Sequence, residues 1–192
     1  MCDVRRPAEP DHRERIISGS EVRKMLRVLG WSRGKPVRSV AQAVAWCFVA
    51  ALQTGMRAGE LAGLRWDDVR DDHVLLHAGK TKTGKARQVP LTPEAARTLK
   101  RMRGYDEDLV FGLKVQSLDA MFRKYRARAG LDGFTFHDSR HTAATRMAQR
   151  VDVLDLCKIF GWTTATRALV YYNPTGSQIA KRLNGGGSVP TQ

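Results

Sequence analysis

Three segments of the sequence carry charged and aromatic residues that core packing alone does not explain. They are TGMRAGEL around Arg57, FTFHDSRH around Arg140, and GWTTATRALVYYN, which contains Tyr171 and Tyr172. Arginine presents several fixed N–H donors to an anion, and histidine exchanges protons near neutral pH or binds a metal. The first two segments therefore indicate a candidate site for an anionic or metal-bound group. The two tyrosines, taken alone, are most simply packing residues of a terminal helix.

The spacing of the second segment groups its polar side chains. His137, Arg140 and His141 occupy positions i, i+3 and i+4, so they project from one face if a helix begins at or before His137. Two histidines at i and i+4 can also chelate zinc. The catalytic Glu of the zincin pattern is absent, however, and no third ligand is obvious, so we expect no metal and no other cofactor. An ordinary surface helix terminus is the remaining alternative.

Two further features add positive charge. Arg57 follows the end of an apolar segment and begins a short helix, and Glu60, three residues on, can orient its guanidinium. A lone arginine at such a position is more often a solvated residue or part of a surface ion pair. The segment GKTKTGK contributes Lys80, Lys82 and Lys85, which are most simply a solvated basic loop that touches phosphates without sequence preference.

Apolar periodicity, capping residues and helix breakers predict a mainly helical domain. Ser18 and Glu21 have the capping-box spacing, and they precede an amphipathic helix that ends near Gly30. A largely apolar helix follows Ser39, and Gly55 ends it. The remaining predicted helices start near Ala58, follow Thr92, and cover 118–129, 138–149, 152–159, 165–172 and 176–183.

Two β-prone stretches flank the basic loop. The sequences HVLLHA at 73–78 and ARQVPL at 86–91 predict an antiparallel hairpin with an exposed tip. A further candidate for a short strand is the segment 109–111. The predicted fold class is therefore mainly α, with a small antiparallel β-hairpin or a three-stranded sheet.

The composition favours a polyanionic partner. The 192 residues include 33 Lys and Arg against 19 Asp and Glu, which gives a formal charge of +14 and a pI near 10.3. Nucleic acid is the commonest polyanionic partner of a soluble domain, while anionic lipid or a contribution to solubility are alternatives. Three scattered cysteines indicate reduced thiols in a cytoplasmic protein. The longest apolar run is too short to span a bilayer, so we expect no membrane partner.

The chain length fits one domain of ordinary size. Residues 1–16 are polar, basic and proline-containing, which indicates an extended arm that joins a further N-terminal module. Residues 17–184 form the predicted domain. The glycine-rich sequence GGGSVPTQ at 185–192 predicts a flexible tail.

Taken in order, these segments resemble the tyrosine recombinase, or phage integrase, family over nearly the whole chain. TGMRAGELAGLRWDDV resembles the family's first-arginine box, KTKTGKARQVPL its lysine hairpin, HDSRHTAAT its His-x-x-Arg-His box, and GWTTATRALVYYNPT its closing box. The family places its tyrosine nine residues after the His or Trp that follows Gly, and counting from Trp162 selects Tyr171. It places its lysine eight residues before the proline of the second strand, which selects Lys82 relative to Pro90.

The resemblance implies transesterification of a DNA phosphodiester. Tyr171 would attack the scissile phosphorus, which forms a 3′-phosphotyrosine and releases a 5′-hydroxyl. Arg57 and Arg140 would stabilise the charge of the pentacoordinate phosphorane, and Lys82 would protonate the leaving 5′-oxygen. His137 would accept the tyrosine proton or hydrogen-bond the phosphate.

Three further residues follow from the same resemblance. Trp162 would donate its indole N–H to the phosphate, while His141 and Glu60 would support the site. Trp162 stands where His is commoner in the family, and Ser139 and Phe160 stand where Leu is usual. The family's N-terminal core-binding domain, the other half of a clamp around DNA, is not represented in the sequence, so we expect salt-sensitive and weakly selective DNA binding.

The resemblance and the basic residues also predict partners. We expect double-stranded DNA as the substrate, held by Lys80 and Lys85 of the hairpin and by the basic helix residues Arg123, Lys124, Arg126 and Arg128. We expect a monomer in solution and a homotetramer on DNA, in which the terminal helix docks onto a neighbouring protomer. An accessory DNA-bending protein would be a further partner. Two rival functions stay open: DNA relaxation of the type IB topoisomerase kind, and a remnant that binds DNA without cutting it.

Overall fold

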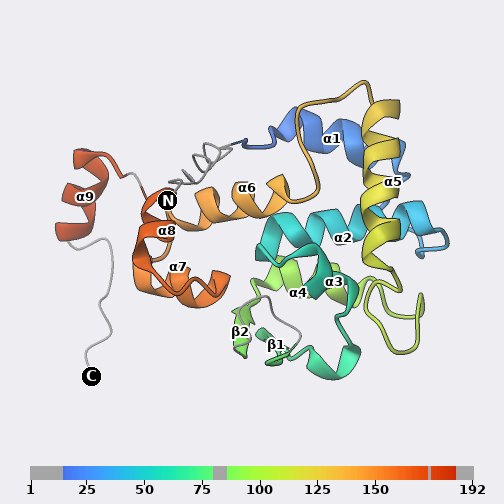
Figure 1. Cartoon of the computed structure of the whole chain (residues 1–192), viewed down its shortest axis with the longest axis horizontal. Coiled ribbons are helices and arrows are strands. Elements are labelled where there is room, and N and C mark those ends of the chain that lie inside the picture. The colour runs from blue at the N-terminus through green and yellow to red at the C-terminus, as the bar shows by residue number, and fades with distance from the viewer. Residues whose placement is uncertain (1–14, 80–85, 173, 185–192) are drawn as a thin grey trace, which may run out of the picture.

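The computed structural model describes residues 15–79, 86–172 and 174–184 (Figure 1). Lys80, Lys82 and Lys85 lie outside these residues, as do most of the predicted arm at 1–16 and the tail at 185–192. The elements, in chain order, are α1 (Gly19–Val28), α2 (Val40–Thr54), α3 (Ala58–Ala62), the short 3-10 helix η1 (Trp66–Asp68), β1 (His73–Leu76), β2 (Arg87–Pro90), α4 (Pro93–Lys100), α5 (Val115–Arg128), α6 (Asp138–Met147), α7 (Val153–Phe160), α8 (Ala165–Leu169) and α9 (Gly176–Leu183). The mainly helical fold class is confirmed.

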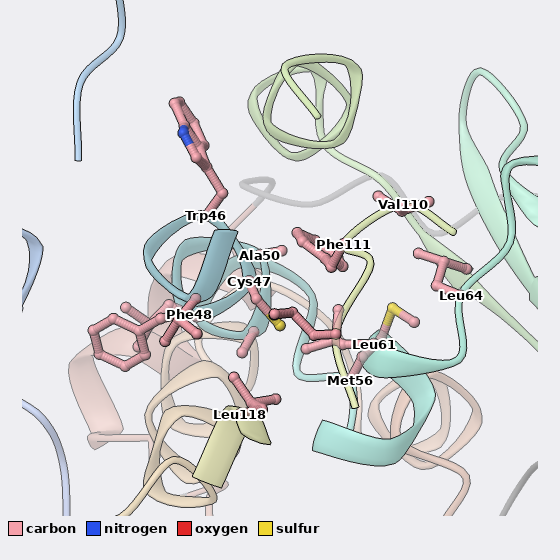
Figure 2. Close-up of a cluster of buried hydrophobic side chains, with 14 of the residues drawn as sticks. Trp46, Cys47, Phe48, Ala50, Met56, Leu61, Leu64, Val110, Phe111 and Leu118 are labelled. Atoms are coloured by element: carbon pink, nitrogen blue, oxygen red, sulfur yellow. The ribbon is translucent and has the colours of Figure 1, made fainter. Parts of the chain in front are cut away.

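The apolar helix α2 lies at the centre of the domain, as its sequence predicts. All its side chains from Ala43 to Leu52 are buried except that of Val49, and the helix contacts α3, α4, α5 and α6. Figure 2 shows apolar side chains that pack around it, among them Phe111 and Leu118 from outside the helix. Ser39 caps the start of α2, and Gly55 ends it in the left-handed conformation at φ 67°. The C-terminal end of α2 is therefore a fixed point of the fold.

Aromatic packing fixes the start of α6, the helix that carries the His-x-x-Arg-His segment. The Phe122 ring of α5 lies 5.9 Å from the ring of Phe134 and 5.4 Å from that of Phe136, both in edge-to-face geometry. Phe136 also faces Phe48 of α2 at 6.3 Å. Because Phe134 and Phe136 are buried immediately before α6, the direction in which that helix leaves the core is set by these contacts.

The described residues contain one sheet, and it has two strands. β1 pairs antiparallel with β2, with Val74 opposite Val89 on the buried side. The prediction of a third strand at 109–111 is wrong: Leu109 forms only an isolated bridge to Arg65. The backbone there is held in a turn instead, since Asp106 Oδ1 accepts the N–H groups of Asp108 and Leu109 at 3.0 and 2.7 Å.

A smaller apolar cluster joins α6, α7 and α8 beside the main core. It is centred on the buried residues Ala144, Leu156, Phe160 and Ala168. The predicted helix 165–172 ends earlier, at Leu169, because Tyr171 N–H donates to Ala168 O at 3.0 Å in a tighter turn. Figure 1 shows α9 standing away from the other helices. No helix in the described part of the chain is long and apolar enough to span a membrane.

Candidate active site

A pocket of about 370 Å³ opens beside α6, between the end of α2 and the segment that follows α8. The fold brings together there five of the six residues predicted to be catalytic, and the sixth, Lys82, lies outside the described residues. The pocket lining is formed by Arg57, His137, Arg140, His141, Trp162, Thr166, Arg167, Val170 and Tyr171. Segments more than a hundred residues apart in the sequence therefore share one pocket.

Arg140 is buried beside the pocket, and each of its two terminal guanidinium nitrogens donates to a backbone carbonyl. Its Nη1 donates to the carbonyl oxygen of Gly55 at 2.6 Å, and its Nη2 donates to that of Phe160 at 2.6 Å. Both carbonyls lie at helix C-termini, where backbone acceptors lack intrahelical partners. The guanidinium carbon also lies 4.7 Å from the centroid of the Phe160 ring. Arg140 therefore joins the end of α2 to the end of α7. Because a guanidinium has five N–H donors, it still has donors for an anion.

Arg57 is the N-cap residue of α3, and Glu60 fixes its direction. The backbone N–H of Arg57 donates to Glu60 Oε2 at 2.8 Å, and its Nη1 donates to Glu60 Oε1 at 2.9 Å. Burial alone would raise the pKa of Glu60, but the hydrogen bonds and charges of Arg87 and Arg57 outweigh it and lower that pKa to about 2. The carboxylate is therefore ionised at neutral pH and orients the Arg57 guanidinium.

Glu60 has a second arginine partner, Arg87, which the sequence motifs did not predict. Arg87 Nη1 and Nη2 donate to the two Glu60 oxygens at 2.8 and 2.7 Å, and Arg87 Nε donates to the carbonyl oxygen of Ile159 at 3.0 Å. A signal for this residue was present in the sequence. The alternation of β2 places Arg87 on the same side as the buried Val89, and an arginine that faces inward requires a partner.

The Tyr171 hydroxyl contacts a histidine, and this histidine is His141 rather than His137. His141 Nδ1 and Tyr171 Oη share a hydrogen bond. The Trp162 ring stacks on the Tyr171 ring with a centroid distance of 5.3 Å and an interplanar angle of 3°. His137 meets His141 edge to face at 5.1 Å. The phenol is thus held between an imidazole and an indole.

The charge of the pocket favours an anion. Burial, together with the nearby His141 and Arg140, lowers the pKa of His137, so its imidazole is uncharged at neutral pH. Burial and the charge of Arg57 lower the pKa of Arg140 to about 9, which leaves the guanidinium protonated at neutral pH. No carboxylate is present in the pocket lining that the structure describes. Among all the residues that the structure describes, no group of three or more His, Cys, Asp or Glu side chains could hold a metal ion.

The basic residues predicted to bind DNA on α5 differ in their exposure. Arg123, Lys124 and Arg128 are exposed. Arg126 is half-buried, and its Nη1 donates to the carbonyl oxygen of Phe134. Three of the four helix residues are therefore available to an external phosphate, while Arg126 is directed toward the segment before α6. Lys80 and Lys85 lie outside the described residues.

Comparisons with known proteins agree with this arrangement. The sequence model of the phage integrase family matches residues 17–177. A Haemophilus influenzae protein described as an integrase/recombinase is 37% identical over 137 residues, covering 70% of this chain and 45% of that protein. The chain spans about half the length of the curated relatives it matches.

Solved structures have the same fold. The catalytic domain of bacteriophage HP1 integrase superimposes with a TM-score of 0.66 at 20% identity, covering 92% of this chain and 98% of that one. A lambda integrase tetramer bound to a Holliday junction gives 0.68 at 19% identity, covering 88% of this chain and 50% of that one. The chain belongs to the phage integrase family, and its fold is that of a tyrosine recombinase catalytic domain.

Proposed function

We propose that this chain is the catalytic part of a site-specific DNA recombinase, which cuts and rejoins DNA through a 3′-phosphotyrosine at Tyr171. The observation that carries the proposal is the shared pocket, which Arg57, Arg140 and Tyr171 all line. Relatives described as integrases and recombinases favour this function over type IB relaxation and over a remnant that does not cut DNA.

The pocket can bind the scissile phosphate before any bond changes. The guanidinium groups of Arg57 and Arg140 would each donate to a non-bridging oxygen, and they are held by Glu60 and by two backbone carbonyls. Because these supports are fixed before DNA arrives, the arginines need little reorganisation when charge builds up on the phosphorane. His137 and the indole N–H of Trp162 would act as further phosphate donors.

Strand cleavage would begin at the contact between Tyr171 and His141. His141 Nδ1 would accept the phenolic proton while Tyr171 Oη forms a bond to phosphorus. The bond from phosphorus to the 5′-oxygen would break, and Lys82 would supply the proton that this oxygen needs. Attack by the 5′-hydroxyl of another strand would reverse these steps and release the tyrosine, so the reaction needs no external energy source.

DNA outside the scissile phosphate would be held electrostatically. Arg123, Lys124 and Arg128 are exposed on α5, and the chain carries a formal charge of +14. Lys80 and Lys85, which lie outside the described residues, would add further phosphate contacts, whereas Arg126 donates to the carbonyl oxygen of Phe134 and so is directed away from an external phosphate. Binding by these groups would weaken steeply as the salt concentration rises.

The active form on DNA would be a homotetramer assembled from protomers that are monomeric in solution. The similarity to a lambda integrase tetramer bound to a Holliday junction supports this proposal. Helix α9 would dock onto a neighbouring protomer, since Ile179 and Leu183 leave apolar side chains exposed at 43% and 81% on a helix that stands apart (Figure 1). An accessory DNA-bending protein would assist at the full recombination site.

Nicked suicide substrates test the proposal directly. Wild-type protein should form a covalent adduct that survives a denaturing gel, Tyr171→Phe should abolish it, and the neighbouring Tyr172→Phe should retain it. Noncovalent retention of DNA by the wild type without an adduct would refute the cleavage function. An adduct that persists in Tyr171→Phe and disappears in Tyr172→Phe would move the nucleophile to the adjacent residue.

A further inference from the structure

We infer that Arg87 is a positioning residue that offsets the negative charge of Glu60, so that Arg57 keeps its positive charge for the scissile phosphate. The inference rests on the proposed function, because it assigns a role to Arg57 in phosphate binding. It concerns a residue outside the pocket lining, which would act through Glu60 and not by touching DNA.

The contacts of Arg87 are those of a fixed, buried partner. The side chains of Arg87 and Glu60 are 7% and 2% exposed, and that of Arg57 is 18% exposed. Both Glu60 oxygens accept from Arg87 at 2.7–2.8 Å, and both also accept from Arg57, one from its backbone and one from its side chain. A bidentate pair at such distances is the strongest and most directional form of this contact.

The net charge of Arg57, Glu60 and Arg87 together explains why the contact between Arg87 and Glu60 would matter for an anion. Arg57 and Glu60 alone would form a neutral pair, and a carboxylate 2.9 Å from the guanidinium would compete with a phosphate for it. With Arg87 included, the group carries a net charge of +1. Because the site is partly shielded from water, that remaining charge acts strongly on an anion placed near Arg57.

The position of Arg87 in the chain links this group to the rest of the site. It is the first residue of β2 and lies five residues after Lys82 in the sequence. Its Nε donates to the carbonyl oxygen of Ile159, the residue before Phe160, whose own carbonyl accepts from Arg140. A Cβ on Gly161 would lie 3.1 Å from Arg87 Cδ, so the glycine leaves the side chain room to reach Glu60. One side chain thus contacts Glu60, which holds Arg57, and Ile159, the residue next to the one whose carbonyl holds Arg140.

A charge-matched double variant separates this role from simple stabilisation. Arg87→Gln should leave Arg57 neutralised by Glu60, and the rate of adduct formation should fall by about 10- to 100-fold. Adding Glu60→Gln removes the competing carboxylate and returns the group to +1, so the double variant should cleave about tenfold faster than Arg87→Gln. Arg87→Lys keeps the charge but loses the bidentate geometry, so its rate of adduct formation should lie between those of wild type and Arg87→Gln.

Three measurements make the result decisive. Noncovalent DNA affinity in a Tyr171→Phe background should change no more in Arg87→Gln than in Arg23→Gln, which removes the same charge from the exposed face of α1. Urea unfolding of each variant shows whether the fold persists. Binding of inorganic phosphate, followed by phosphorus NMR, should weaken in Arg87→Gln and recover in the double variant.

A double variant as slow as Arg87→Gln or slower, or with phosphate binding as weak, would overturn the inference and leave Arg87 a purely structural residue. The phosphate measurement also distinguishes the two proposals. Wild type that forms no adduct would refute the recombinase function, while the phosphate titration would still decide the role of Arg87.

Discussion

Gly55 connects the end of the central helix to Arg140, and the loss of stability on its replacement by alanine can be worked out. Its φ of +67° lies in the left-handed region, which costs an L residue about 1–2 kcal/mol. An added Cβ would lie 2.5 Å from Cε1 and Cζ of Phe160, so the ring must shift, at the cost of about 1–3 kcal/mol typical of overpacked cores. Gly55→Ala should therefore lower the free energy of unfolding by about 2–5 kcal/mol.

Gly30→Ala is the matched control for this prediction. Gly30 has a φ of +70°, but the nearest atom to its added Cβ would be Gln42 Cγ at 3.8 Å, an ordinary contact. The free energy of unfolding of this control should fall only by the backbone term, about 1–2 kcal/mol. Urea unfolding curves with equal slopes would give the two losses directly. The additional loss of unfolding free energy in Gly55→Ala, compared with Gly30→Ala, measures the cost of the steric clash with Phe160.

The same substitution should impair the site. The Phe160 ring and carbonyl both contact Arg140, and the Gly55 carbonyl is its other anchor. A displaced ring should therefore slow adduct formation in Gly55→Ala, under conditions in which the variant is still folded, and leave Gly30→Ala near wild type. Equal losses of stability in the two variants, or an unimpaired Gly55→Ala, would refute the link between the helix end and Arg140.

Three further outcomes are expected. Trp162→Ala should cleave about tenfold more slowly than Trp162→Phe, because only the phenylalanine keeps an aromatic face against the Tyr171 ring; equal rates in adduct assays would rule out the stack as a positioning contact. Because the folded pKa of Glu60 is lowered to about 2, its stabilisation is present above the ordinary pKa of 4.5 and is lost as the pH falls toward 2. Glu60→Gln should flatten that part of the stability–pH curve, as followed by urea unfolding at each pH, and an unchanged slope would contradict the pairing. Replacing Arg123, Lys124 or Arg128 by Gln should each reduce the slope of log affinity against log salt by about 0.9 in DNA titrations; an unchanged slope would exclude that residue from phosphate contact.

Local sequence signals predicted the elements that carry the site, because those signals act over a few residues. The capping residue Ser39 and the terminator Gly55 set the bounds of α2, and the i, i+3, i+4 spacing placed the polar residues of α6 on one side. Gly161 likewise ends α7 in the left-handed conformation, at φ 63°. The convergence of these segments was implied by family resemblance and not by spacing alone.

Features that depend on tertiary contacts were missed or misplaced. The third strand at 109–111 failed because an aspartate turn holds the backbone there, a competition that β-propensity does not measure. His141 and not His137 contacts the Tyr171 hydroxyl, a contact between α6 and the turn after α8 that helical spacing within α6 does not specify. The Arg87 partner of Glu60 lies 27 residues away in the chain, and only folding brings the two together.

The most direct test of this account identifies the residue that becomes linked to DNA. After reaction with a suicide substrate and nuclease trimming, tryptic digestion should yield a peptide that spans Ala168 to Lys181 and carries a 3′-linked nucleotide. Fragmentation by mass spectrometry should place that nucleotide on Tyr171, whose hydroxyl contacts His141 beside Arg140. A nucleotide on Tyr172 or on a side chain outside this pocket would contradict the proposed chemistry.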